Sequence, residues 1–323
     1  MFVDDATILV TGGTGSFGQK FTEIVLKEHH PKALRIYSRD ELKQVEMQSR
    51  FRDPRLRFFI GDVRDRDRLY RALNGVDLAV HAAALKQVPV AEYNPLEAIK
   101  TNIEGAANLI DASIDNGVPR VMALSSDKAV HPVNLYGATK LVAEKLIIQA
   151  NAYRGRAQTR FSVVRYGNVV GSRGSVIPVF REQAKTGILT ITDERMTRFW
   201  ITQEQAVRLI VTCIDRMQGG EVFVPKIPSM RVVELAKVLA PDAKLDVVGI
   251  RPGEKLNELL LTEEEAPRAR DFGDHYVIEP EHPFWKRDEL KGGRPLPAGF
   301  RYTSDGNSDW LSPQQLREML RDL

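Results

Sequence analysis

The segment ATILVTGGTGSFG, residues 6–18, decides the fold. Its first five residues form a short apolar run with β propensity, and Gly12, Gly15 and Gly18 follow at intervals of three. Glycines let the backbone turn tightly and approach a diphosphate, and the free amides at the start of the next helix, predicted from about Gln19 to His29, favour negative charge. A plain glycine-rich turn is the alternative, but the strand before it and the helix after it favour a dinucleotide-binding loop.

Apolar strand-like runs and helical patterns alternate through the first half of the chain. Strands are predicted at 33–37, 56–63, 77–84, 120–125 and 159–165, and helices at 64–73, at 94–115 and from Tyr136 onward. This alternation implies a mainly parallel sheet with helices on both faces, the doubly wound α/β fold of Rossmann type. Ligands of such sheets bind beyond the carboxyl ends of the strands.

The alternation weakens after residue 170. Helices are predicted near 175–186, 204–217 and 231–240 and short strands near 221–225, 244–250 and 275–280, whereas 262–300 is rich in charge, Pro and Gly and predicts little. We expect a dinucleotide-binding domain over residues 1–170, with a return crossing near 200–225. A smaller mixed α/β substrate-binding domain is expected over residues 171–323.

Composition argues against several classes of protein. The 323 residues include 46 Lys and Arg against 43 Asp and Glu, an excess too small to indicate nucleic-acid binding. Cys213 is the only cysteine, so no intramolecular disulfide can form, and the six histidines show no metal-binding spacing, so no metal is expected. The acidic N-terminal segment lacks the basic and apolar regions of a signal peptide. No apolar run approaches the roughly 20 residues that span a bilayer. We expect a cytoplasmic protein without membrane contact.

The end of the second predicted strand, Ser38-Arg39, indicates which dinucleotide is bound. NAD enzymes usually carry an acidic residue at this place, about 20 residues beyond the glycines, to hold the ribose hydroxyls. Here a hydroxyl followed by Arg39 and Lys43 suits the additional phosphate of NADP. The alternative is that both cations only solvate the start of a helix. We predict NADP.

The ends of the third and fourth predicted strands are expected to lie near the same dinucleotide. Asp62, at the end of the third strand, can accept a hydrogen bond from the adenine amino group, or it can cap the following helix. The small residues that end the fourth strand permit close approach to the cofactor, and His81 among them is predicted to be structural. We expect the cofactor to contact Gly12, Thr14, Gly15, Ser16, Phe17, Gly18, Ser38, Arg39, Lys43, Asp62, Val63, Ala82, Tyr136, Lys140 and Val169.

Residues suited to catalysis follow the fifth strand. Ser126, Asp127 and Lys128 end it, and Tyr136 and Lys140 lie four apart at the start of the next helix, so a phenol and an ammonium share one face. Tyrosine titrates near pH 10 in isolation, and we expect the neighbouring ammonium and a positive nicotinamide to lower its pKa until it can deprotonate an alcohol. Ser126 would hydrogen-bond the reacting oxygen, and Lys140 would hold the ribose. The alternative is an exposed pair without function.

Several segments resemble the extended short-chain dehydrogenase/reductases, namely TGGTGSFG, YGATK and RPGEK. More narrowly, YSRDELKQ, FFIGDVRD, HAAALKQVPVAEYNP, SSDKAV, VRYGNVVGSRGSV, MTRFWIT and VPKIPSM resemble the inverting UDP-N-acetylglucosamine 4,6-dehydratases of pseudaminic acid biosynthesis. The matches run from about residue 6 to residue 260. The resemblance implies an NADP-dependent lyase that acts on a UDP-sugar, and it implies a homo-oligomer, either a dimer or a hexamer.

The resemblance also implies roles for Asp127 and Lys128. Oxidation at sugar carbon 4 acidifies the hydrogen on carbon 5, a base removes it, an acid expels the carbon-6 hydroxyl as water, and hydride returns to carbon 6. Two proton-transfer groups are therefore needed besides Tyr136. In the family pattern Lys128 is the base and Asp127 the acid, and because retaining relatives carry an Asp-Glu pair, the lysine implies inversion at carbon 5. The alternative is a surface salt bridge or a turn aspartate.

Substrate-binding residues are likewise implied by the resemblance. They are Lys86, Asn168, Arg173, Arg198, Arg251 and Glu254, with the arginines suited to a diphosphate because their planar fork binds two oxygens. A solvated surface role is the alternative for the isolated basic residues. Two other functions remain open. A sugar-nucleotide 4-epimerase shares the Tyr and Lys but needs no additional acid and base, whereas a non-catalytic NADP-binding module is disfavoured by the catalytic residues.

Overall fold

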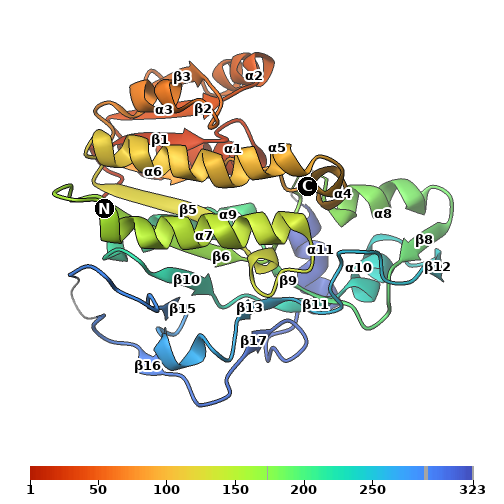
Figure 1. Cartoon of the computed structure of the whole chain (residues 1–323). Coiled ribbons are helices and arrows are strands. Elements are labelled where there is room, and N and C mark those ends of the chain that lie inside the picture. The colour runs from red at the N-terminus through yellow and green to blue at the C-terminus, as the bar shows by residue number, and fades with distance from the viewer. Residues whose placement is uncertain (173, 287–289, 322–323) are drawn as a thin grey trace.

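The computed structural model describes residues 1–172, 174–286 and 290–321. A ten-stranded sheet forms its centre, in the order β16-β14-β15-β10-β6-β5-β4-β1-β2-β3 (Figure 1). The parallel strands are β1 (Thr7–Thr11), β2 (Ala33–Ser38), β3 (Leu56–Ile60), β4 (Leu78–His81), β5 (Arg120–Ser126), β6 (Arg160–Tyr166) and β10 (Val222–Pro225). The predicted doubly wound, mainly parallel sheet is confirmed.

Both faces of this sheet are buried, because successive side chains of a strand point to opposite faces. In β1, Leu9 joins the core on one face and Ile8 and Val10 the core on the other. Helices α3 (Arg66–Leu73), α6 (Gly105–Asp115) and α7 (Leu135–Tyr153) cover the face of Leu9, whereas α1 (Ser16–Glu28) and α9 (Gln203–Arg216) cover the opposite face (Figure 1).

The long helix predicted at 94–115 is interrupted. It consists of α5 (Pro95–Ile99), a π-helical turn (Lys100–Glu104) and α6, and the short helix α4 (Val88–Tyr93) precedes it without having been predicted. Asn102 lies in the π-helical turn, where its side chain hydrogen-bonds the backbone of Leu85 and the hydroxyl of Thr139. The interruption thereby ties the loop after β4 to helix α7, which carries Tyr136.

The chain after residue 170 contributes to two parts of the molecule. Strands β14 (Ala269–Asp271), β15 (His275–Ile278) and β16 (Arg294–Pro295) extend the large sheet antiparallel. The strand predicted near 275–280 is β15, whereas β14 and β16 were not predicted. The remaining segments form a smaller mixed region with its own core, which includes Ile177, Leu189, Trp200 and Leu235. Its elements are β7 (Asn168–Val169), α8 (Val176–Ala184), β8 (Ile188–Ile191), β9 (Thr197–Ile201), β11 (Ser229–Arg231), α10 (Val232–Leu239), β12 (Lys244–Val247) and α11 (Pro313–Arg321).

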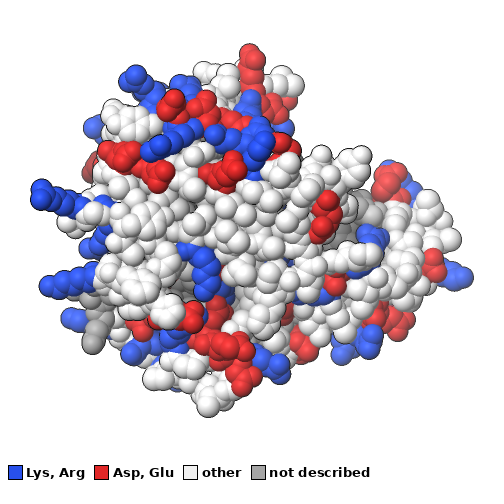
Figure 2. All heavy atoms as spheres, viewed as in Figure 1, with Lys and Arg blue, Asp and Glu red and all other residues white. Residues whose placement is uncertain are grey.

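Charged side chains of both signs are interspersed over the face of the molecule that Figure 2 shows. Many form close pairs, such as Arg208 with Glu28 and Arg64 with Glu97. Among the described residues, no helix is both long and apolar enough to cross a membrane.

Candidate active site

The glycine loop joins β1 to α1 in close contact with the backbone beneath it. Gly12 has a φ of +65°, and a Cβ at this position would lie 3.0 Å from the carbonyl of Ala82. A Cβ at Gly18 would collide with the backbone of Gly13. Gly15 is the N-cap of α1, and the first turn of that helix carries no acidic residue. The free amides of this turn, where Ser16 and Phe17 lie, therefore offer an anion site. Thr14 is buried within the loop.

The ends of β2 and β3 bring Ser38, Arg39 and Asp62 together. Ser38 is buried, and its hydroxyl accepts a hydrogen bond of 3.0 Å from Gln44. The guanidinium of Arg39 is half exposed and lies 3.5 Å from the Asp62 carboxylate. Lys43 is directed elsewhere, because its ammonium pairs with Asp40 at the start of α2 (Glu41–Phe51).

The alternative assignment of Asp62 as a helix cap is wrong. Helix α3 is capped by Asp65, whose side chain accepts a hydrogen bond from the Arg68 amide. Asp62 instead accepts hydrogen bonds from the backbone amide and the guanidinium of Arg64. The neighbouring Val63 is buried and packs where Gly105 of α6 leaves room, since a Cβ at Gly105 would meet it at 2.7 Å.

Helix α7 begins directly against the turn that follows β5. Asn134 caps it by accepting from the Gly137 amide at 2.7 Å, and a Cβ at Gly137 would collide with the Lys128 carbonyl. Only glycine permits this approach, which sets Tyr136 beside the 3-10 turn Asp127–Ala129. Ser126 ends β5, accepts a hydrogen bond from the Lys128 amide and lies close enough to the Tyr136 side chain to act on its pKa. The structure therefore brings the predicted Ser, Tyr and Asp-Lys residues together.

Contrary to the expectation from the sequence, the pKa of Tyr136 is raised, because burial outweighs Ser126 and the Lys128 charge, which act to lower it. The expected influence of Lys140 is replaced by that of Lys128, because the Lys140 ammonium donates instead to the Leu124 carbonyl at 2.6 Å. Burial also lowers the pKa of Lys140 to about 8, against the opposing charge of Glu144. Tyr136 and Lys140 are not an exposed pair, because Lys140 is buried and Tyr136 partly buried.

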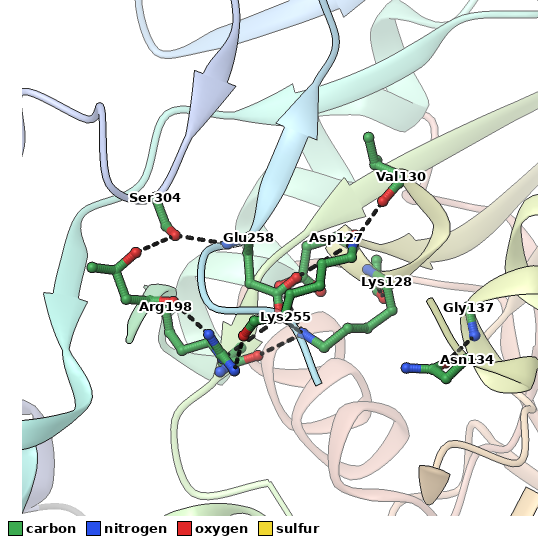
Figure 3. Close-up of polar contacts among 12 residues, drawn as sticks. Asp127, Lys128, Val130, Asn134, Gly137, Arg198, Lys255, Glu258 and Ser304 are labelled. Carbon is green, nitrogen blue, oxygen red and sulfur yellow. Dashed lines mark hydrogen bonds and ion pairs between the residues drawn. The ribbon is translucent and has the colours of Figure 1, made fainter. Parts of the chain in front are cut away.

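Asp127 and Lys128 belong to a larger buried group, which we call the acid–base cluster and which consists of Asp127, Lys128, Arg198, Lys255 and Glu258 (Figure 3). The Lys128 Nζ lies 3.0 Å from Asp127 Oδ2 and 2.7 Å from Glu258 Oε1. Glu258 also lies 3.5 Å from Arg198 and 3.7 Å from Lys255. Asp127 and Glu258 are each 2% exposed or less, so this is not the surface salt bridge that was the alternative.

The two carboxylates of the cluster have opposite tendencies. Burial raises the pKa of Asp127, and the nearby negative charge of Glu258 adds to this, although Lys128 opposes it. Burial also acts on Glu258, but Lys128 and Arg198 outweigh it and lower its pKa. For Lys128, burial disfavours the charge, yet Asp127 and Glu258 together raise its pKa. Asp127 is thus the carboxyl that binds a proton more readily, and Glu258 the one that stays charged.

Sequence reasoning missed Glu258 and Lys255. Lys255 donates to the carbonyls of Val130 at 2.6 Å and of Asp127 at 3.3 Å, so it clamps the turn that carries the Asp-Lys pair. Glu258 precedes β13 (Leu259–Leu261), and its backbone is bonded in both directions to Ser304. The RPGEK segment at 251–255 was the available signal, but only its Arg251 and Glu254 were assigned a role, in substrate binding.

The implied substrate-binding residues occupy different environments. Asn168, which precedes Val169 in β7, lies 3.4 Å from the Lys128 ammonium. Arg198 is buried and donates to the carbonyls of Thr197, Lys255 and Leu256.

The other implied residues lie in loops. Lys86 is exposed after β4, and Arg251 is exposed beyond β12. Glu254 keeps one buried carboxylate oxygen without a hydrogen-bond partner in the described part of the chain. Arg173 lies outside the described residues.

The surroundings of His81 are those of a buried residue with a structural role. It is buried in β4, its Nδ1 lies 2.8 Å from the Thr11 hydroxyl, and burial lowers its pKa to about 3. Within residues 1–172, 174–286 and 290–321, no cluster of His, Cys, Asp and Glu side chains is arranged to hold a metal ion.

A dinucleotide-type loop on a doubly wound sheet, followed by Ser126, Tyr136 and Lys140, defines an extended short-chain dehydrogenase/reductase. The model of the family described as "Polysaccharide biosynthesis protein" matches residues 8–280, and the chain belongs to this family. Its sequence is 51% identical over 97% of its length to a UDP-N-acetylglucosamine 4,6-dehydratase (inverting) of Campylobacter jejuni subsp. jejuni serotype O:2, of which the match covers 96%.

Other relatives place this similarity in context. A UDP-glucose 4-epimerase of Rickettsia conorii is 42% identical, and the match covers all of this chain and 97% of that one. The X-ray structure of Pen from Bacillus thuringiensis superposes with a TM-score of 0.92 at 38% identity, covering 100% of this chain and 99% of that one. DesIV of Streptomyces venezuelae, a dTDP-glucose 4,6-dehydratase solved with NAD bound, gives a TM-score of 0.69 at 25% identity, covering 77% and 86%.

Proposed function

We propose that this protein dehydrates UDP-N-acetylglucosamine to a UDP-4-keto-6-deoxy sugar with inversion at carbon 5. The observation that carries the proposal is the buried Asp127–Lys128 pair beside Tyr136. A dehydrogenase or a 4-epimerase needs only the tyrosine, whereas elimination of water needs an additional acid and an additional base. The 51% identity to an inverting UDP-N-acetylglucosamine 4,6-dehydratase supports the same reaction.

The residues present fit a nicotinamide dinucleotide. Gly12 and Gly18 leave no room for side chains between the loop and the backbone beneath it, and the open first turn of α1 suits a diphosphate. Bound there, the dinucleotide would supply the hydride acceptor and donor for carbons 4 and 6. We assign the contacts around it to the residues predicted from the sequence, with Lys140 near its ribose.

Tyr136 begins the reaction by accepting the proton of the carbon-4 hydroxyl, while Ser126 hydrogen-bonds the same oxygen. The resulting ketone makes the hydrogen on carbon 5 acidic, and Lys128 removes it as the base once its own proton has passed to Asp127. Asp127 protonates the carbon-6 hydroxyl, which leaves as water. The raised pKa of Asp127 supports its role as the acid, because a carboxyl that keeps its proton can donate it.

We propose NADP as the dinucleotide. The end of β2 carries Ser38 and Arg39 and no acidic residue, and the guanidinium of Arg39 is half exposed beside Asp62. An arginine in this position suits a ribose phosphate, since it forms charge-assisted hydrogen bonds. Lys43 contributes less than its sequence position suggested, because it pairs with Asp40.

We propose that the UDP-sugar binds where the smaller region faces the carboxyl ends of the sheet strands. The buried, unsatisfied oxygen of Glu254 supports a ligand hydroxyl at that place, and Asn168 beside Lys128 supports a substrate contact there. Lys86, Arg198 and Arg251 remain proposed contacts. A division of the chain near residue 170, a cytoplasmic location, a dimer or hexamer, and a place in pseudaminic acid biosynthesis also remain proposals.

One experiment separates the proposal from its rival. Purified protein is mixed with UDP-N-acetylglucosamine, and the products are followed by NMR. We expect a 6-deoxy-4-keto sugar, and coupling constants recorded in heavy water should report inversion at carbon 5. A 4-hydroxy epimer formed without loss of water would reject the dehydratase in favour of the epimerase, which the 42% identity to a UDP-glucose 4-epimerase keeps as the second candidate.

A further inference from the structure

We propose that Glu258 is a positioning residue for the acid–base pair: its carboxylate holds the Lys128 ammonium beside Asp127, so that the proton taken from carbon 5 passes from Lys128 to Asp127. The inference rests on the proposed dehydration and adds to it a residue from the far end of the chain. Glu258 is 1% exposed, and its carboxylate faces the three cations of the acid–base cluster.

The geometry around Lys128 carries this assignment. A lysine side chain is a flexible stem, and an ammonium without an anchor samples many positions. Here the Nζ is held by Glu258 at 2.7 Å and by Asp127 at 3.0 Å (Figure 3). Asn168 lies 3.4 Å from the same Nζ. Glu258 is the closest of the three contacts.

Glu258 is itself rigidly supported. Its amide donates to the Ser304 hydroxyl at 2.8 Å, and its carbonyl accepts from the Ser304 amide at 2.8 Å. Ser304 follows β17 (Tyr302–Thr303), which pairs with β13. The C-terminal part of the chain, whose role the sequence did not reveal, thereby holds an anion against the catalytic lysine.

Proton balance explains why Lys128 and Asp127 must stay in contact. In the elimination, the bond between carbon 5 and hydrogen breaks, the proton joins the Lys128 amine, and the electron pair forms the double bond between carbons 5 and 6. The bond between carbon 6 and oxygen breaks, and the hydroxyl leaves with the Asp127 proton as water. Lys128 is then an ammonium and Asp127 a carboxylate, and one proton transfer across 3.0 Å restores both.

The remaining protons also balance. Tyr136 gains one proton from the carbon-4 hydroxyl and gives up one proton as carbon 5 gains one, when hydride returns to carbon 6. The proton that Lys128 removed therefore need not return to the face of carbon 5 from which it came. Its transfer to Asp127 is compatible with inversion.

The charge on Glu258 sets the pH range over which the pair keeps this one shared proton. The groups that face Lys128 are Asp127, Glu258, Arg198, Lys255 and Tyr136. Glu258 raises the pKa of Lys128, so its removal must lower that pKa. The Asp127–Lys128 pair would then lose its last proton at a lower pH. The alkaline decline in activity would therefore begin at a lower pH.

The test compares the kcat and KM of Glu258→Gln and Glu258→Asp with those of the wild type across pH. We expect Glu258→Gln to lower kcat on the order of 100-fold, because misplacing a catalytic group by about 1 Å has such an effect. The alkaline limb of its pH profile should shift to lower pH, whereas KM should change much less. Glu258→Asp keeps the charge, so its alkaline limb should stay near that of the wild type while kcat is partly restored.

Glu265→Gln is the matched control. Glu265 comes from the same segment and is also a largely buried carboxylate, paired with Arg165 at 2.7 Å, but it lies outside the acid–base cluster. We expect this variant to lose thermal stability without a shift of the alkaline limb. If Glu258→Gln does not fold, because three cations lose their common anion, Glu258→Asp decides through its lowered kcat.

Three results would overturn the assignment. They are a wild-type kcat in Glu258→Asp, an unshifted pH profile in folded Glu258→Gln, and a shift that Glu265→Gln reproduces. Failure of the proposed function is distinguishable, because wild-type protein would then not dehydrate UDP-N-acetylglucosamine at all.

Discussion

The two halves of the candidate site are assembled differently. The dinucleotide-binding edge is local, since one strand, one turn and one helix within residues 7–28 supply its loop. The acid–base cluster is not, since Lys255 reaches the turn of Asp127 from 128 residues away. The first depends on space that glycines leave free, and the second on a balance of buried charges. Damage to one half should therefore leave the other intact.

Replacing Lys128 should impair the acid–base cluster more severely than any other change. In Lys128→Met, dehydration should fall by about 1,000-fold or more, because a general base contributes that much. Oxidation at carbon 4 depends on Tyr136 and should continue, more slowly because the Lys128 charge no longer acts to lower the pKa of Tyr136; it is visible as the absorbance of reduced nicotinamide after substrate is added. Product NMR and absorbance measured on the same sample check both expectations.

Lys145→Met serves as the control for that variant, because Lys145 lies on α7 with an exposed side chain paired to Glu281. Its turnover should match the wild type. Lys128→Met that dehydrates at the wild-type rate would remove Lys128 as the base, and loss of both half-reactions together would indicate a general disruption of the site.

The local half of the site was largely predictable from the sequence. Periodicity and glycine spacing place β1, the loop and α1 within a few residues of their observed bounds, because each depends on near neighbours. Tyr136 and Lys140 were predictable for the same reason, since four residues of helix fix their relation.

The cluster could not be predicted in the same way. Nothing in the sequence around Glu258 states that it faces Lys128, because this contact requires β13 to pair with β17 and Ser304 to fix the backbone. The helix break at Lys100–Glu104 was missed as well, since a π-helical turn has no reliable pattern of apolar residues. Strands β14 and β16 were missed because they are very short and lie at the edge of the sheet, whereas β15 was predicted near 275–280.

A methyl group added to the glycine loop should impair the dinucleotide-binding half of the site. In Gly18→Ala, the added Cβ would collide with the Gly13 backbone, so the loop must move. Overpacking of this kind costs about 1–3 kcal/mol, which corresponds to dinucleotide binding weakened by about 5- to 150-fold. Isothermal titration with NADP measures the change.

Gly75→Ala is the matched glycine control, because its φ of +66° makes it similarly special while a Cβ there would meet nothing within 4 Å. It should lose some stability and no affinity for NADP. The ion pairs of the acid–base cluster should persist in Gly18→Ala, so kcat at saturating NADP should stay within about threefold of the wild type. A large loss of kcat at saturation would show that the two halves are coupled.

The smallest effect is expected at the end of β2, where replacing Arg39 tests whether the dinucleotide is NADP. Its guanidinium is half exposed, so its hydrogen bonds to a ribose phosphate contribute about 1 kcal/mol, and Arg39→Ala should weaken NADP binding about fivefold. NAD lacks that phosphate, so its affinity should not fall, and Arg195→Ala in the smaller region should change neither. Equal losses for NADP and NAD would mean that Arg39 only neutralises Asp62, and the shape of the loop would then be the whole basis of dinucleotide binding at this edge.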